Sequence, residues 1–322
     1  MRIAVLIMSG NQEPSLRNVE TLKETMVKNS ANMDLKNSYD FFTYSYKDSD
    51  APVDTVLDCT KDERYPNCYD IHISGVESVY HTYEKTYTTY DYLLNNEDKY
   101  GRYDWFVRIN ISCYVNLKLM DLVIKDMKKD TIYANALNSY LDLAFEYCNY
   151  FYPRGDFYIV SHETMEEIMP VGKSLMYCDQ KLKNRPAVPH VDDTLFGYAF
   201  ILAAGKKFYK RLQMIYYNFI PMVSDNPEVL RTMVAGNFSK NAIASRVKSV
   251  PDGQMCGYSW NDNKYRLYDP EKMKILDDII AGIKYESVTL DDILVPPLQE
   301  KQTIYISASS ITPSHLVSII DY

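Results

Sequence analysis

Short apolar runs alternate with amphipathic segments along the first 140 residues of the chain. The apolar runs that predict buried strands lie at 2–8, 39–48, 54–59, 69–75, 103–109 and 131–137. Segments with apolar residues at helical spacing separate several of these runs, beginning at Ser15, near 77 and near 117. Strands that alternate with helices predict an α/β fold with a mostly parallel sheet flanked by helices on both faces.

Two of the predicted helices have a well-defined apolar face. Ser15 is the expected N-cap of the first helix, in which Leu16, Val19, Leu22 and Met26 recur at helical spacing. The second helix, at about 77–94, places these side chains on one face: Tyr80, Tyr83, Tyr87, Tyr90 and Leu94. We expect this stripe to pack on the sheet; a row of rings that stacks on a ligand is the alternative.

Short polar turns follow two of the predicted strands. Ser9, Gly10 and Asn11 follow the first strand, and Asn110 and Ser112 follow the strand at 103–109. In open parallel sheets, ligands bind at the carboxyl ends of the strands, near the point where the strand order reverses. These two turns are therefore expected to form one functional rim.

The second half of the chain is patterned less clearly. The sequence predicts a turn and strand at 152–161, a polar loop leading into an apolar helix at 190–205, and a helix at 270–283. The stretch from about 295, which begins with a proline pair at 296–297, is expected to be an extended tail or a link to a further part of the protein.

The net charge of −8 over 322 residues argues against nucleic acid as a partner, because binding it would need a strong local basic surface. The compact basic run at 205–211 leaves a peripheral membrane contact open, whereas no apolar run is long enough to predict a transmembrane segment. The six cysteines lack metal-ligand spacing, so we expect reduced thiols in a cytoplasmic protein: Cys59, Cys68, Cys113, Cys148, Cys178 and Cys256. Walker A, GxGxxG and GxSxG signatures are missing from the sequence.

Four segments follow one another in a specific order: "YEKTYTTYDYLL" with Lys85, "YDWFVRINISCYVN", "YPRGDFYIVS" and "HVDDTLFGYAF". In this order they resemble the fringe-like and β1,3-glycosyltransferase branch of the GT-A glycosyltransferases. The resemblance covers about residues 1–205 and also extends to bacterial and large-virus glycan transferases in which the strand ends in Arg-x-Asn-x-Ser. It implies a GT-A fold with a catalytic domain at 1–215, divided into a nucleotide-sugar half (1–112) and an acceptor half (113–215). A C-terminal extension at 216–322 would pack on this domain.

The sequence departs from the family where the fringe-like pattern has an Asp-x-Asp turn that holds a divalent metal. Asn110 and Ser112 offer neutral oxygens instead, and Mn²⁺ or Mg²⁺ prefers carboxylates beside a diphosphate. No metal is therefore expected at this turn, although a weak metal held partly by the donor is left open. Arg108, Lys85, Arg246 and Lys248 could meet the diphosphate charge instead, and Ser9, Gly10 and Asn11 should lie near the base.

The resemblance implies that Asp193 is the catalytic base and that Asp192 orients a hydroxyl or caps the helix. An inverting transferase needs one carboxylate that accepts the proton of the attacking hydroxyl. The alternative is a purely structural role, because Asp-Asp-Thr is also a good helix N-terminus. Acceptor or sugar contacts are expected from Arg154, Gly155, Asp156 and His190.

The function implied by the resemblance is transfer of a sugar from a nucleotide-diphosphate donor, with UDP-sugars favoured, to a saccharide hydroxyl with inversion. The product would be a surface polysaccharide or a viral or bacterial glycan. Three alternatives stay open at this point: a degenerate protein that binds a sugar nucleotide or a partner without catalysis, a retaining glycosyltransferase, and a nucleotidyltransferase on a similar fold.

Overall fold

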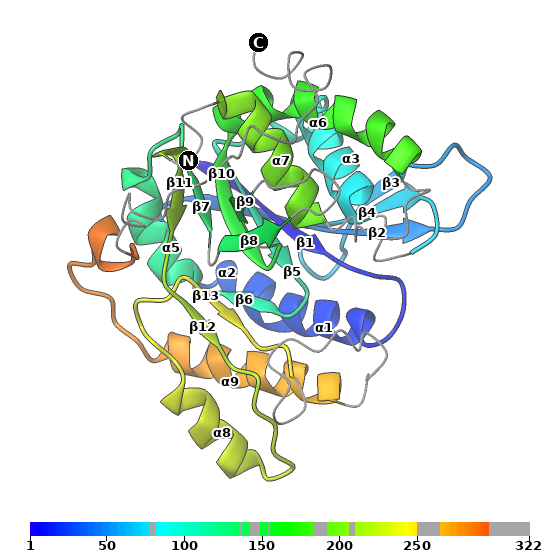
Figure 1. Cartoon of the computed structure of the whole chain (residues 1–322). Coiled ribbons are helices and arrows are strands. Elements are labelled where there is room, and N and C mark those ends of the chain that lie inside the picture. Colours follow the sequence, from blue (N-terminus) through cyan, green and yellow to red (C-terminus); the bar gives the residue numbers. More distant parts are fainter. Residues whose placement is uncertain are drawn as a thin grey trace.

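The computed structural model describes residues 1–77, 82–134, 137–141, 149–153, 155–182, 192–205, 210–249 and 265–295. Its centre is an eight-stranded sheet with the strand order β11-β7-β10-β5-β1-β2-β4-β3 (Figure 1). The strands are β1 (Arg2–Met8), β2 (Ser38–Lys47), β3 (Val56–Lys61), β4 (Cys68–Ser74), β5 (Trp105–Asn110), β7 (Ile132–Ala134), β10 (Phe157–Ser161) and β11 (Leu212–Met214). Four adjacent strands, β5, β1, β2 and β4, are mutually parallel, which confirms the predicted mostly parallel sheet.

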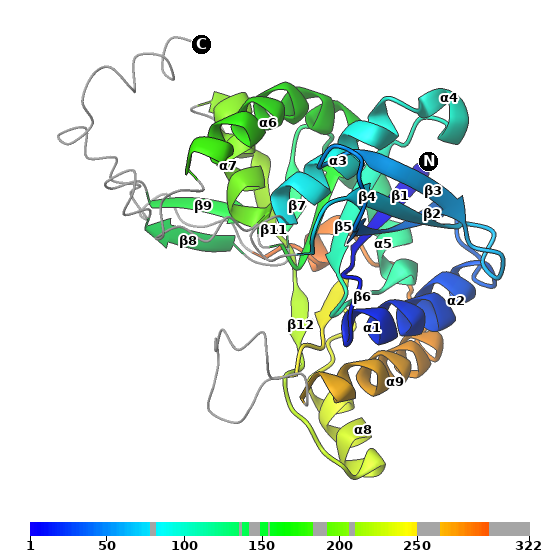
Figure 2. The same ribbon diagram turned by 90° about the vertical axis from the view of Figure 1, so that its right-hand side faces the viewer.

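Helices cover both faces of this sheet, as Figures 1 and 2 show from two sides. One face carries α1 (Ser15–Leu22), a π-helical turn (Lys23–Val27), α2 (Lys28–Ser30), α5 (Leu117–Val123) and α9 (Asp269–Ala281), with α8 (Pro227–Gly236) packed on α9. The other face carries α3 (Thr82–Leu94), α6 (His162–Leu182) and α7 (Asp192–Ala204). A short α4 (Glu97–Tyr100) and single 3₁₀ turns at Ile124–Asp126, Tyr265–Tyr268 and Leu290–Asp292 complete the described helices.

Strand β1 shows why the sheet has a core on each side. Ile3, Val5 and Ile7 belong to the core under α1 and α9, whereas Leu6 and Met8 belong to the core under α3, α6 and α7. A continuous apolar run with both faces buried is the pattern of a central parallel strand. The tyrosine stripe of α3 lies in the second core, where Tyr83, Tyr87 and Tyr90 are all buried, so it packs on the sheet as expected.

The start of α1 differs from the prediction. Pro14, not Ser15, is the N-cap, and no side chain caps the helix. The backbone N–H of Ser15 instead donates to the carbonyl of Gln12 at 2.9 Å, so a backbone turn starts the helix. Leu16, expected in the apolar face, is 50% exposed.

The boundaries of other elements also differ from the predicted ones. The described part of the helix expected at 77–94 begins at Thr82, and its last buried apolar side chain is Leu93. The strand expected at 152–161 is two strands, β9 (Asn149–Pro153), which forms a hairpin with β8 (Leu137–Leu141), and β10. Helices α6 and α8 were missed.

Two short strands bring the C-terminal part of the chain against the first half. β13 (Ala244–Arg246) pairs antiparallel with β6 (Cys113–Val115) and parallel with β12 (Tyr217–Phe219). α8 and α9 add Leu230, Met273 and Leu276 to the core shared with β1. Residues 296–322, the predicted tail, lie outside the described residues.

Candidate functional site

The strand order reverses at the carboxyl ends of β1 and β5. Both strands are parallel, and β2 lies on the opposite side of β1 from β5. Met8 and Asn110 are register partners, so the turns after these strands begin side by side. The two turns therefore lie together, as the sequence predicted, at the position where ligands bind in many open α/β sheets.

The turn after β5 is organised by neutral groups. The side-chain oxygen of Asn110 accepts from the backbone N–H of Ser112 at 3.3 Å and from its hydroxyl at 3.4 Å. The backbone N–H of Asn110 donates to the carbonyl of Asp156 at 3.0 Å, which joins the turn to the start of β10. Within the part of the chain that the structure describes, no cluster of three His, Cys, Asp or Glu side chains could hold a metal ion.

Arg246 lies beside this turn because β13 pairs with β6. The N–H of Val247 donates to the carbonyl of Ser112 at 2.8 Å, directly after the register pair of Arg246 and Cys113. The Arg246 guanidinium donates to Asp156 at 2.6 Å, in an ion pair that is largely buried. The structure thus brings together Asn110, Ser112, Asp156 and Arg246, which the sequence had assigned to donor and acceptor contacts.

Lys248 lies near enough to the buried carboxylates of Asp156 and Asp269 to feel their charges. Arg246, two residues before it, is held by Asp156, and Ser249, the next residue, donates its backbone N–H to Asp269 at 2.9 Å. Burial lowers the pKa of Lys248 to about 8, and the charges of Arg246 and Arg266 add to this effect. The side chain therefore belongs to a cluster of three cations at the edge of the rim.

Arg266 is the member of this cluster that the sequence did not reveal. Its Nε donates at 2.5 Å to Asp269, which is fully buried at the start of α9. Among the described residues, Nε of Arg246 and Nη2 of Arg266 are buried without a hydrogen-bond partner. Unsatisfied guanidinium donors favour the binding of an anion. No local pattern in the sequence pointed to Arg266; the nearby Asp-Pro pair predicts only the start of α9.

Lys85 and Arg108 lie beneath the rim rather than on its surface. Lys85 is 1% exposed, donates to the carbonyl of Ser9 at 2.6 Å and pairs with Glu77. Arg108 is fully buried, and its Nη2 lies 3.0 Å from the sulfur of Met8. In this structure both side chains support the ends of β1 and β5, which differs from the direct donor contact expected from the sequence.

Asp192 and Asp193 are the first two residues of α7. Phe196, one turn further along, stacks on Tyr158 with ring centroids 4.6 Å apart. Tyr158 is the register partner of Arg108 on β5, so the first turns of α7 lie over the β10–β5 pair. By strand alternation Asn110 shares this sheet face with Arg108.

The remaining predicted residues are placed only in part. Gly155 is buried at the turn before β10, and Asp156 is 5% exposed and engaged by Arg246. Arg154 and His190 lie outside the described residues. Ser9 and Gly10 are among the residues that line a groove of about 680 Å³, and the side-chain amide of Asn11 donates to the carbonyl of Tyr46 at 3.3 Å.

Comparisons with known proteins give structural likeness alone. No protein-family model and no curated protein sequence matches the chain. A glycosyltransferase involved in the glycosylation of the major capsid of PBCV-1 is similar to it, with 14% identity, 84% of this chain and 99% of that chain covered, and a TM-score of 0.40. The galactosyltransferase LgtC, solved with donor and acceptor sugar analogs, has 11% identity, 87% and 97% covered, and a TM-score of 0.44. Values this low assign no function, which has to be argued from the site itself.

No helix among the described residues is both long enough and apolar enough to cross a membrane.

Proposed function

We propose that the chain is a glycosyltransferase of the GT-A type that moves a sugar from a nucleoside-diphosphate donor to a saccharide hydroxyl. The observation that carries the proposal is the rim at the strand-order reversal, where Met8 and Asn110 are register partners and Arg246 lies alongside. The four ordered sequence motifs support the same class. The product, a surface polysaccharide or a viral or bacterial glycan, follows from the sequence resemblance only.

The cation cluster of Arg246, Lys248 and Arg266 is the proposed site of the donor diphosphate. A diphosphate carries charge that a metal ion offsets in many transferases. Guanidinium groups can take that role because they are permanently charged and present several donors to phosphate oxygens. Asn110 and Ser112 would add neutral hydrogen bonds. A divalent metal held partly by the donor would still find only neutral side-chain oxygens in this turn.

The proposed reaction is a single displacement. The acceptor hydroxyl attacks C1 of the donor sugar while Asp193 takes the hydroxyl proton, and the bond between C1 and the diphosphate oxygen breaks. The nucleoside diphosphate leaves with the bonding electrons, and the cation cluster stabilises its developing charge. Attack opposite the leaving group inverts the anomeric centre. The start of α7 lies over β10 and β5, on the sheet face that Asn110 shares, which is compatible with this role.

The paired variants Asp193→Asn and Asp192→Asn test the base. With a donor that binds, Asp193→Asn should lower the rate of donor hydrolysis and of transfer by about 10²–10⁴-fold, the usual contribution of a general base. Asp192→Asn, the matched control, should lose far less. Full activity in Asp193→Asn would reject the assigned base, and a product of retained anomeric configuration by NMR would reject the single displacement.

A non-catalytic binder is the second candidate, favoured by the lack of carboxylates in the turn after β5. This candidate predicts tight binding of a sugar nucleotide with no hydrolysis or transfer in the unmodified protein. A retaining transferase predicts instead turnover with unchanged anomeric configuration, and a nucleotidyltransferase predicts release of inorganic diphosphate.

A further inference from the structure

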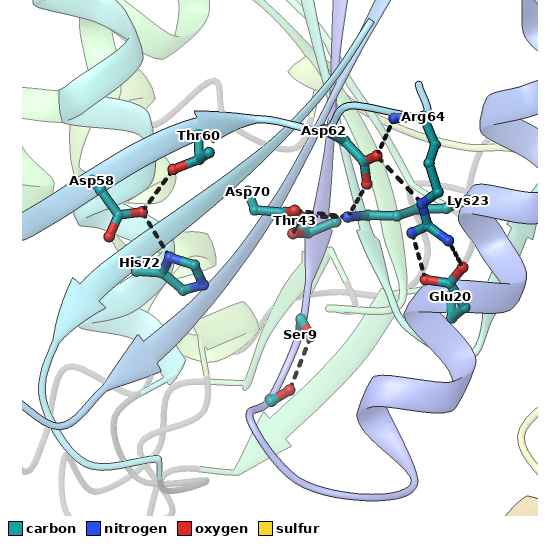
Figure 3. A network of polar contacts seen from close by, with 11 residues as sticks. Ser9, Glu20, Lys23, Thr43, Asp58, Thr60, Asp62, Arg64, Asp70 and His72 are labelled. Carbon is teal, nitrogen blue, oxygen red and sulfur yellow. Dashed lines mark hydrogen bonds and ion pairs between the residues drawn. The ribbon is translucent and has the colours of Figure 1, made fainter. Parts of the chain in front are cut away.

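A groove of about 680 Å³ opens beside the rim, between α1 and the α1-facing side of β2 and β4. Ser9 and Gly10 line it next to the rim, and its sheet side is lined by Thr43, Ser45 and His72; Figure 3 labels Ser9, Thr43 and His72. This volume lies within the range of pockets that bind small molecules.

Four polar residues lie side by side in a row across the sheet: Ser9 after β1, Ser45 on β2, His72 on β4 and Asp58 on β3. The N–H of Ser9 donates to the carbonyl of Tyr44, which puts Ser9 level with Ser45 on β2. Ser45 is the register partner of His72 on β4, and His72 is the register partner of Asp58 on β3. The neighbours of Ser45 and His72 along their strands lie in the core under α3, so alternation points both side chains toward α1.

The pairing with Asp58 fixes the chemistry that His72 offers to the groove. Nδ1 of His72 lies 2.7 Å from a carboxylate oxygen of Asp58. A carboxylate only accepts, so Nδ1 carries the hydrogen, and in the neutral imidazole Nε2 is then an acceptor. In Figure 3 this second nitrogen points away from Asp58, on the side where Thr43 and Lys23 lie. Within the described residues no hydrogen bond engages it.

The charges on the floor of the groove are already paired. Lys23 is 5% exposed and donates to Asp62 at 2.9 Å and to Asp70 at 2.7 Å, while Thr43 donates to Asp70 at 2.5 Å. Burial lowers the pKa of Lys23, but the hydrogen bonds to the two carboxylates outweigh it, and the pKa ends above its ordinary value. The two carboxylates outnumber the single lysine, so this part of the groove keeps a net negative charge. It suits an uncharged, hydrogen-bonding ring better than a phosphate.

The position of the groove fits one end of the proposed donor. The transferred sugar would lie toward α7, and the diphosphate at the ends of β5 and β13. The nucleoside must then extend the other way, over the end of β1. His72 lies two strand spacings beyond Ser9, about 10 Å, in the direction that leads into the groove.

We propose that this groove holds the base of the donor nucleotide and that His72 selects bases with a ring N–H. Uracil and guanine present a ring N–H on the Watson–Crick edge, which can donate to Nε2. Cytosine and adenine present a ring nitrogen that is itself an acceptor, so an acceptor would face an acceptor. Ser45 can donate or accept beside His72 and so can pair with a neighbouring carbonyl of the base. This inference rests on the proposed function.

Isothermal titration of UDP, GDP, CDP, ADP and inorganic diphosphate, at about pH 8, above the ordinary pKa of an imidazole, tests the inference. The unmodified protein should bind UDP or GDP about tenfold or more tighter than CDP and ADP, since an unmade hydrogen bond in a recognition site lowers affinity by that order. His72→Ala should remove this preference by weakening the favoured nucleotide about tenfold. Its affinity for inorganic diphosphate should not change. Lys61→Ala, an exposed change on β3 outside the groove, is the control.

The outcomes separate the two proposals. If the unmodified protein binds nucleotides without base preference, or if His72→Ala keeps the preference, the base groove is wrong and the transferase proposal stands. If no nucleotide binds the unmodified protein, the transferase proposal itself fails. Far-ultraviolet circular dichroism and thermal melting of His72→Ala check that the variant is folded; if it is not, Ser45→Ala, which should weaken the favoured nucleotide several-fold, takes its place.

Discussion

Lys248→Met is expected to make the protein more stable and a weaker binder of its donor. Burial and the charges of Arg246 and Arg266 lower the pKa of Lys248 from 10.5 to about 8, against the opposing charges of Asp156 and Asp269. At about 1.4 kcal/mol for each pKa unit, holding the charged form in the folded state costs up to about 3 kcal/mol. Solvent screening of this partly buried group reduces the expected gain to about 1–3 kcal/mol at pH 7.

The pH dependence of this effect has a definite sign. Between pH 8 and 10.5 the unfolded chain keeps the Lys248 proton and the folded chain has lost it, so the free energy of unfolding rises with pH. The cost is fully present below pH 8 and is relieved by pH 10.5. Lys248→Met should therefore be stabilised at pH 7 and lose that part of its advantage near pH 10. Donor affinity in the unmodified protein should fall as pH rises through about 8.

Urea unfolding followed by circular dichroism at pH 7 and pH 10, for both proteins, measures the difference. Lys248→Arg is the matched variant that keeps the charge, because arginine does not titrate in this range; its donor affinity should not fall through pH 8. Lys125→Met, at an exposed position, controls for the substitution itself. A stability difference between Lys248→Met and the unmodified protein that is equal at both pH values would refute the reasoning.

Three further changes test other parts of the structure. Arg246→Gln leaves the buried carboxylate of Asp156 without its ion pair, so urea unfolding should show a loss of about 2–4 kcal/mol, and donor titration should show a large loss of affinity. Lys23→Met removes the lysine partner of the Asp62 and Asp70 carboxylates, of which Asp62 keeps its contacts with Arg64, and should cost about 3–5 kcal/mol at pH 7; a loss that does not shrink below pH 4, where carboxylates protonate, would contradict the ion-pair origin. Phe196→Ala removes the ring that seats α7 on Tyr158 and should cost about 3–5 kcal/mol and lower kcat more than donor affinity; an unchanged kcat would speak against a catalytic α7.

The sheet and its rim could be predicted because the signals are local. The central strands are continuous apolar runs, and a polar turn directly after a buried strand has to lie at that strand's carboxyl end. The tyrosine stripe of α3 was equally readable, since Tyr83, Tyr87 and Tyr90 repeat at helical spacing and are buried. Helix α6 was missed because Pro170 interrupts a segment that nevertheless continues as a helix over His162–Leu182.

The candidate site could be predicted only where its residues adjoin such strands. Asn110 and Ser112 belong to that group. Arg246 was foreseen as a charge, but its place beside them depends on β13 pairing with β6, a contact between segments about 130 residues apart that no local pattern encodes. The adjacency of Ser45 and His72 depends in the same way on the register between β2 and β4. Burial of Lys85 could not be read either, because a lysine inside an amphipathic helix gives no sign that its ammonium will meet Ser9 and Glu77.

The central claim is that a nucleoside-diphosphate sugar binds at the β1–β5 edge through side-chain cations rather than through a metal ion. Isothermal titration of UDP-sugars and GDP-sugars into the protein in EDTA, repeated with Mn²⁺ and with Arg246→Gln, measures this directly. The account predicts saturable binding in EDTA that Mn²⁺ changes little and that Arg246→Gln weakens by tenfold or more. Absence of binding in both EDTA and Mn²⁺, or binding that Arg246→Gln leaves intact, would contradict it.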